Sequence, residues 1–396
     1  MFTRPAVRAL PEKIIRDRAA PMSVSNLFSY PEESAVADSN RVLIGLLADP
    51  DLPSRLAQHL GDDLPAALAR TLGPETTWET EVLADPFEAM YPDHDQLIDK
   101  ARERVHRTPW DLALCVTDLP MQDERGVLVA NVDVARRVVV ISLPALGGLR
   151  LRRRVADLAL AITIALWSGP ASGPSIAAQL ARRLPAGMRV HQQPPGTDVH
   201  IFRGGRWGVP TLLAGMVRAN RPWQLIIGLS TALAGAMAGT AFGVLYSTVW
   251  QLATSLSGVR LAGISLAALT TLTIWIIAGH GLWEPRPLKR GAPDSDRKLR
   301  NAGTVTTIAV GTTAFFGTLY VLALAAVALV VPPDYLAAIL HRPAQVPDYL
   351  AMALLATVLG TVAGAVGSGL ENDLTVRKAA YNHRERERRR RAEQQR

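Results

Sequence analysis

The sequence predicts an α/β cytoplasmic domain with a mainly parallel sheet, followed by an all-α transmembrane domain of four helices. Two observations carry this prediction. Between Arg41 and Trp167, short apolar runs alternate with amphipathic segments, which is typical of an α/β domain. In the second half of the chain, four long segments lack Asp, Glu, Lys and Arg, which is typical of membrane-spanning helices.

The α/β prediction depends on apolar runs of strand length, bounded by turn residues. Strands are expected at Arg41–Asp49, Thr77–Asp85, Asp111–Pro120, Gly126–Val132 and Ala135–Leu143. The segments Leu52–Leu72 and Asp95–Arg107 have apolar residues at helical spacing. Strands joined through helices pair in parallel, and the sheet is therefore expected to be mainly parallel.

The stretch Arg137–Trp167, RVVVISLPALGGLRLRRRVADLALAITIALW, begins as a strand and ends in an apolar run. Its uncharged part, Leu158–Trp167, has ten residues. Ten helical residues rise about 15 Å, which is half the thickness of a bilayer core. We therefore expect a helix that is buried against the sheet, not an entry into the membrane.

Four segments exceed the ~20 apolar residues that a spanning helix needs. They are Pro222–Val259, Leu261–Trp283, Asn301–Pro333 and Tyr349–Leu370. The helices themselves are expected over about 223–250, 261–283, 302–331 and 349–370. Four soluble helices without charge would have to lack a polar face, and surface helices normally have one.

Lys and Arg are distributed unevenly over the loops between these spans. Arg203–Arg221 holds four, Glu284–Arg300 holds six and the tail from Arg377 holds nine, whereas the opposite loops hold only Arg260 and Arg342. Cytoplasmic loops carry the excess of Lys and Arg. The sequence thus predicts a multi-pass protein of the cell (plasma) membrane, with both termini in the cytoplasm.

These boundaries divide the chain into five parts. They are a leader at 1–39, the α/β domain at 40–170, an extension or linker at 171–221, the transmembrane domain at 222–370 and a basic tail at 371–396. The leader is rich in Pro, Arg, Ser and Glu and is expected to be disordered. The extension is rich in Pro and Gly, and its VHIFR segment is a candidate strand.

Polar residues directly follow two of the expected strands. Asp49 ends the first strand, and Thr117 and Asp118 end the third. Ligands bind at the carboxyl ends of the strands in an open α/β sheet, and these three residues are therefore candidates for binding a cation or a polar ligand. Ordinary use of Asp at the transition from strand to loop is the alternative.

The sequence predicts no cofactor, no metal site and no catalytic residue. The eight His residues show no metal-ligand spacing. The single cysteine, Cys115, lies within an apolar run and is expected to be a buried, unreactive side chain. One cysteine allows no intrachain disulfide.

Two sets of arginines are expected to contact anionic lipid headgroups. They are Arg152, Arg153 and Arg154 at the start of the apolar helix, and Arg388, Arg389, Arg390 and Arg391 in the tail. A solvated basic turn is the alternative for the first set. Nucleic acid is not expected as a partner, because Tyr381 is the only aromatic residue beside the basic run of the tail.

Glycines recur at every fourth position in two expected spans. They are Gly235, Gly239 and Gly243 in the first span, and Gly360 and Gly364 in the fourth. This spacing lets two helix backbones approach closely. It indicates packing within the four-helix bundle or, alternatively, a face on which two copies of the chain associate.

Part of the soluble half resembles archaemetzincin-type zinc proteases. The resemblance is in the order of DLALCVTDLP, a short strand, VVVISLPAL and a long helix. In that family the matching helix carries H-E-x-x-H, which binds zinc. This chain has RVADLALAITIALW there, and the resemblance therefore implies a related fold without the metal chemistry.

The layout of the whole chain resembles a group of multi-pass membrane proteins of unassigned function from high-GC bacteria. The matching segments are IGLLADP, DLALCVTDLP and SLPALG, followed by helical spans. The resemblance suggests a methylene-tetrahydrofolate dehydrogenase activity, which would need a dinucleotide site. The first strand is followed by ADPDLPSRL, without the G-x-G-x-x-G of such a site, so the residues do not support that activity.

The sequence thus predicts an integral membrane protein whose soluble domain is a non-enzymatic binding or regulatory module. Two alternatives stay open: an enzyme with its ligand site at Asp49, Thr117 and Asp118, and a small transporter or channel subunit. The spans carry no acidic or basic residue at mid-depth, which counts against ion-coupled transport. The expected partners are the bilayer, anionic headgroups and either a second copy or another protein.

Overall fold

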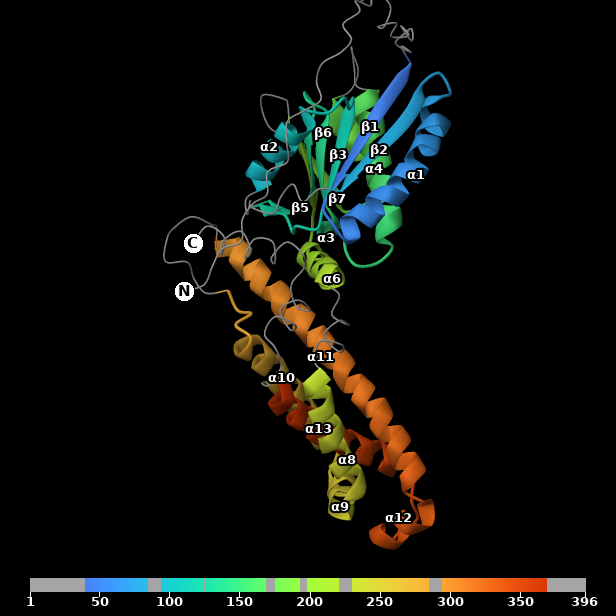
Figure 1. Ribbon diagram of the computed structural model, residues 1–396, viewed down its shortest axis with the longest axis vertical. Coiled ribbons are helices and arrows are strands. Elements are labelled where there is room, and N and C mark those ends of the chain that lie inside the picture. The colour runs from blue at the N-terminus through green and yellow to red at the C-terminus, as the bar shows by residue number, and fades with distance from the viewer. Residues whose placement is uncertain are drawn as a thin grey trace, which may run out of the picture. The chain divides into compact units, whose positions relative to one another are not determined.

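The structure is a computed structural model of the 396-residue chain. It describes residues 40–84, 94–123, 125–168, 175–192, 198–220, 230–284 and 294–368. The leader and the basic tail lie outside the described residues, together with the arginines at 388–391. The described residues form an α/β domain and a set of long apolar helices (Figure 1).

Eight strands form one sheet in the order β2-β1-β3-β6-β5-β8-β7, with β4 paired to β5. The strands are β1 (Arg41–Ala48), β2 (Thr77–Ala84), β3 (Leu112–Thr117), β4 (Gln122–Asp123), β5 (Gly126–Asp133), β6 (Val138–Ser142), β7 (Met188–Gln192) and β8 (Asp198–Arg203). Pairs among β2, β1, β3 and β6 are parallel. The remaining pairs are antiparallel.

The sheet is therefore mixed, and the expectation of a mainly parallel sheet is corrected. The loop from Asp133 to Val138 is too short to cross over the sheet, and β5 and β6 consequently pair as an antiparallel hairpin. The segment at 171–221, expected as an extension or linker, contributes β7 and β8 to the same sheet. The candidate strand VHIFR lies within β8.

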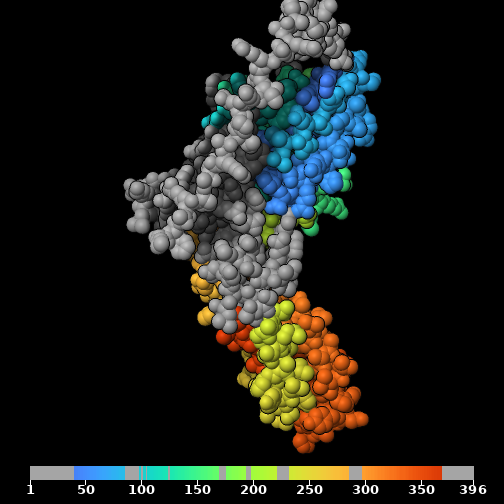
Figure 2. Space-filling view, viewed as in Figure 1, coloured from blue at the N-terminus to red at the C-terminus, as the bar shows by residue number. Residues whose placement is uncertain are grey.

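Helices cover both faces of the sheet (Figure 1). One face carries α1 (Leu52–Leu72) and α4 (Leu151–Trp167), and its core also takes in α3 (Leu143–Leu146), α5 (Ile176–Arg183) and α6 (Gly208–Asn220). The other face carries α2 (His94–Val105). The outer side of α1 and the edge strand β2 lie at the surface of the domain, where Figure 2 shows them in blue.

Apolar residues alternate between the two faces along β1. Ile44 and Leu46 belong to the core beneath α1 and α4, whereas Leu47 belongs to the core beneath α2. At Gly45 a side chain would collide with the ring of Trp110. Glycine at this position lets Trp110 lie directly on the strand. The continuous apolar sequence of β1 is that of a strand buried on both faces.

The apolar run that ends at Trp167 is a helix of the soluble domain, as expected. It forms α4, which starts at Leu151 and buries Val155, Leu158, Ala159 and Ile162 against the sheet and α1. The helix contributes apolar area at about 25 cal/mol per Å² removed from water. It therefore stabilises the α/β domain, in whose core it is packed.

The described residues from Ser230 onward form six helices. They are α8 (Ser230–Leu245), α9 (Ser247–Ser255), α10 (Gly258–Gly279), α11 (Asp294–Val330), α12 (Pro333–Leu340) and α13 (Val346–Ser368). Three of them, α10, α11 and α13, are long and apolar enough to cross a membrane. The pair α8–α9 also passes this test as a unit, but it is bent by 82°, so three or four spans are present by length and composition.

The first expected span, at about 223–250, is therefore not one straight helix. The bend lies at Tyr246, whose backbone is extended. The indole nitrogen of Trp250 donates a hydrogen bond of 3.0 Å to the carbonyl of Val244, which satisfies a backbone acceptor freed by the bend. Trp250 is 4% exposed and packs in one core cluster with Leu261, Val331 and Leu336.

Candidate functional site

The carboxyl ends of β1 and β3 meet where the strand order of the sheet reverses. From β1 the chain passes through α1 to β2 on one side, whereas β3 lies on the other side of β1. Ligands of open α/β sheets bind at such a switch point. Asp49 follows β1, and its backbone N–H donates to the carbonyl of Val116 in β3 at 3.2 Å.

The structure thus brings the three candidate ligand residues to one edge of the sheet. Ala48 pairs with Val116, so that Asp49 lies beside Thr117 and Asp118. Asp49 is 1% exposed, Thr117 0% and Asp118 8%. Burial of carboxylates requires compensating polar or charged partners, and this edge is one of the places where polar side chains are buried in the α/β domain.

The loop after β3 is fixed by two hydrogen bonds. The hydroxyl of Thr117 accepts from the backbone N–H of Leu119 at 3.0 Å. The hydroxyl of Ser142, at the end of β6, donates to the carbonyl of Leu119 at 2.6 Å. Ser142 was not among the residues predicted for the site, although its place directly after the run VVVI was a signal for it. Both hydroxyls stabilise the loop that carries Asp118.

The loop after β1 has an unusual backbone. Asp51 has a positive φ of 72° and is the N-cap residue of α1. Its side chain makes no capping hydrogen bond. Its carbonyl accepts from the hydroxyl of Ser54 at 3.1 Å. A non-glycine residue with positive φ is uncommon, and such strain is frequent at ligand sites. The strain supports a binding role for the Asp49–Asp51 turn.

In the part of the chain that the structure describes, no group of three or more His, Cys, Asp or Glu side chains is placed to hold a metal ion. Cys115 is 0% exposed and belongs to the apolar core beneath α2. The chemistry that the edge offers is thus hydrogen-bond acceptance and negative charge.

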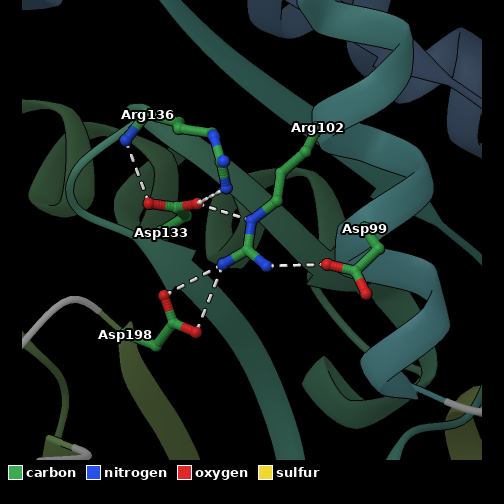
Figure 3. Close-up of polar contacts among 5 residues, drawn as sticks. All are labelled: Asp99, Arg102, Asp133, Arg136 and Asp198. Atoms are coloured by element: carbon green, nitrogen blue, oxygen red, sulfur yellow. Dashed lines mark hydrogen bonds and ion pairs between the residues drawn. The ribbon is translucent and has the colours of Figure 1, made fainter.

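A second polar cluster, centred on Arg102 of α2, was not predicted from the sequence (Figure 3). Arg102 Nε lies 2.5 Å from Asp133 and Arg102 Nη2 lies 3.1 Å from Asp198. Asp133 and Asp198 are opposite each other on β5 and β8, where two like charges would repel. Asp99 also accepts from Arg102, at 2.8 Å.

The environment of Arg102 favours its charged form. Burial by itself would lower the pKa, but hydrogen bonds to Asp99 and Asp133 and the charges of Asp133 and Asp198 raise the pKa above its ordinary value. Asp198 lies in the segment expected to be a linker, and no local pattern pairs it with Arg102. The cluster binds the antiparallel half of the sheet to α2 and is structural.

The arginines expected at the membrane surface have partners within the domain. Arg152 contacts Asp63 at 2.9 Å and Arg153 contacts Asp157 at 3.7 Å. Arg154 donates to the carbonyl of Leu146 at 2.6 Å. Two of the three charges are thus balanced by carboxylates, which leaves less net charge for an anionic surface.

The glycines of the two spans lie at one contact between α8 and α13. A side chain at Gly235, Gly239 or Gly243 would meet α13, and one at Gly360 or Gly364 would meet α8. For example, a Cβ at Gly239 would lie 2.7 Å from that of Ala363. The five glycines therefore face a partner helix of the same chain.

Comparison with known proteins returned nothing for this chain: no family model, no curated protein and no solved structure matches it.

Proposed function

We propose that this protein is a multi-pass membrane protein whose α/β domain is a non-enzymatic binding module on the cytoplasmic side. The observation that carries the proposal is the buried polar edge at the switch point, formed by Asp49, Thr117 and Asp118. The long apolar helices would retain this module at the membrane.

The chemistry of the edge suggests the class of ligand. Two carboxylates attract positive charge and accept hydrogen bonds, so the ligand is expected to be a small molecule with amine or hydroxyl donors. Thr117 already accepts from a backbone N–H in its own turn. The side chain of Thr117 is thus part of the loop structure, and its hydroxyl is a poor candidate for a nucleophile. This favours a binding site over a catalytic site at this edge.

The orientation is part of the proposal. If the bent pair α8–α9 crosses the membrane as one span, four spans return the chain to the side from which it entered. In the segments that flank the spans, nineteen Lys and Arg residues then lie on the side of the α/β domain and two on the other side, which supports a cytoplasmic location of both termini.

Thermal unfolding of the full-length protein in nanodiscs tests the binding function. Polyamines, nucleosides, folates and divalent cations are added separately, because a ligand that binds the folded state raises the midpoint. We expect at least one donor-bearing ligand to raise it, and D49N and D118N to abolish the rise. D157N is the matched control, since Asp157 is exposed and paired with Arg153 away from this edge. A response lost equally in D157N would contradict the site.

A transporter or channel subunit is the second candidate. The 82° bend between α8 and α9 favours it, since transporters place discontinuous helices at their substrate sites. The absence of acidic and basic residues at mid-depth of the spans counts against it. The test of this candidate is solute or ion flux in reconstituted vesicles, compared with tight vesicles of the lipid alone. Flux above that of the lipid vesicles would support a transporter or channel subunit.

A further inference from the structure

The antiparallel half of the sheet ends in a cavity that is far from the edge at β1 and β3 in the strand order. Its volume is about 350 Å³. Three segments meet there: the start of β5, strand β7 and the end of β8, followed by the glycine-rich loop RGGRWG, Arg203–Gly208. Gly204 donates its backbone N–H to the carbonyl of Gly187 at 3.0 Å, which fixes this loop beside β7.

The lining of the cavity is basic. It includes Arg125, Arg189 and Arg203, together with His191. No Asp or Glu lines it among the residues that the structure describes. Arg189 lies across Gly204, because a Cβ there would be 3.0 Å from Arg189 Nε. Glycine at this position allows the guanidinium to lie on the loop.

Several other arginines of the domain have a carboxylate partner. Arg102, Arg152 and Arg153 each contact a carboxylate. Within the described part of the chain, Arg125, Arg189 and Arg203 form no ion pair. Asp123 accepts the backbone N–H of Arg125 and is not part of the lining. The cavity therefore holds positive charge without a counter-charge from the described residues.

Arg203 adds to this imbalance from the interior. Its Nε donates to the carbonyl of Ala145 at 3.1 Å. Burial lowers the pKa of Arg203, and the nearby positive charge of Arg154 lowers it further. An anion in the cavity would offset both effects, because opposite charge favours the ionised guanidinium.

We propose that this cavity binds a phosphate group. Guanidinium groups match the geometry of phosphate through paired N–H donors, and a loop of glycines lets backbone approach the ligand closely. Exposed apolar side chains lie in the loop and directly after it, with Trp207 66% and Val209 46% exposed. A phospholipid headgroup or a soluble phosphate ester could supply the phosphate. The site is independent of the binding function proposed for β1 and β3.

The test uses the full-length protein in neutral detergent. Its unfolding midpoint is measured against inorganic phosphate, glycerol 3-phosphate, short-chain phosphatidic acid and short-chain phosphatidylcholine. The pocket variant is R125Q/R189Q. The control is R182Q/R183Q, which removes the same charge from exposed positions at the end of α5.

We expect a phosphate-bearing compound to stabilise the protein. Its apparent affinity should fall at least about tenfold in R125Q/R189Q, because the variant loses the charge-assisted hydrogen bonds of two guanidinium groups. The control should keep the wild-type affinity. R189K, which keeps the charge but not the fork of donors, should bind with intermediate affinity. Stabilisation by phosphatidic acid alone would identify a lipid headgroup, and stabilisation by glycerol 3-phosphate or inorganic phosphate as well would identify a free phosphate group.

Two results would overturn the proposal. One is that none of the phosphate-bearing compounds changes the midpoint of the wild-type protein. The other is that the pocket and control variants lose affinity equally, since binding would then follow net charge and not this cavity. If the double variant does not fold, R189Q alone is compared with R182Q, and equal affinities of these two single variants would likewise count against the site.

Discussion

The guanidinium of Arg102 joins three parts of the α/β domain that are distant in the chain. It connects α2 with the end of β5 and with the start of β8, and its partner Asp198 is 96 residues away. The side chain of Asp133 is 2% exposed. A buried carboxylate is costly without its cation, so the stability of the domain is expected to depend on this one arginine.

Replacement of Arg102 by alanine should lower the free energy of unfolding by about 3 kcal/mol, because among the described residues Asp133 would keep only its contacts to Arg136. R153A is the matched control, since Arg153 forms an exposed pair with Asp157. It should change stability by less than about 1 kcal/mol. Equal losses in the two variants, measured by chemical denaturation of the full-length protein in detergent, would argue against a special role for Arg102.

The pH dependence of this effect follows from the direction of the pKa shift. The folded state raises the pKa of Arg102, and the stabilisation is therefore fully present below the pKa of the unfolded chain and lost as pH rises through the folded value. Both values lie far above neutrality. The difference between wild type and R102A should thus stay constant from about pH 6 to about pH 9.

At the scale of secondary-structure elements, the packing of α8 against α13 depends on glycine. Gly235, Gly239 and Gly243 meet Ala356, Leu359 and Ala363 of α13 so closely that larger side chains have no room. In contrast, Gly263 in α10 and Gly317 in α11 have open space where a side chain would extend. The same residue type is therefore required at one helix face and replaceable at another.

G239L should separate α8 from α13 and lower the thermal midpoint of the protein in detergent by several degrees, whereas G317L should leave it nearly unchanged. The size of the oligomer, measured by light scattering, distinguishes the two roles considered for these glycines. If G239L dissociated a dimer and left the midpoint of the monomer intact, the glycines would serve association between copies and not packing within one chain.

At the scale of the whole molecule, the number of spans decides whether the α/β domain lies on the same side of the membrane as the C-terminal tail. With α8–α9 as one span, the domain and the C-terminal tail share a side. With three spans they lie on opposite sides. The distribution of Lys and Arg favours the first arrangement.

Single cysteines in a C115A background test this topology in intact cells with a membrane-impermeant maleimide. Q345C should be labelled from outside, and S295C only after permeabilisation. Q58C, at an exposed position on α1, should behave as S295C does. Labelling of Q58C from outside would indicate three spans and an external α/β domain.

The sequence alone was sufficient for the features that are local. A segment without charge over about 20 residues is apolar wherever it is placed, so the membrane character of α10, α11 and α13 could be predicted. The strands β1, β3 and β6 could be predicted because burial on both faces requires a continuous apolar run. The positions of Asp49 and Asp118 at strand ends followed directly from those strands.

The remaining features depend on contacts between distant residues. Strand order and direction follow from which segments pair, and the Pro- and Gly-rich segment that supplies β7 and β8 has no local pattern that assigns it to the sheet. The partners of Arg102, the arginines of the basic cavity and the bend held by Trp250 also come from separate segments. Tertiary structure decided these, because an ion pair, a cavity or a bend held by one side chain forms only after the chain has brought its parts together.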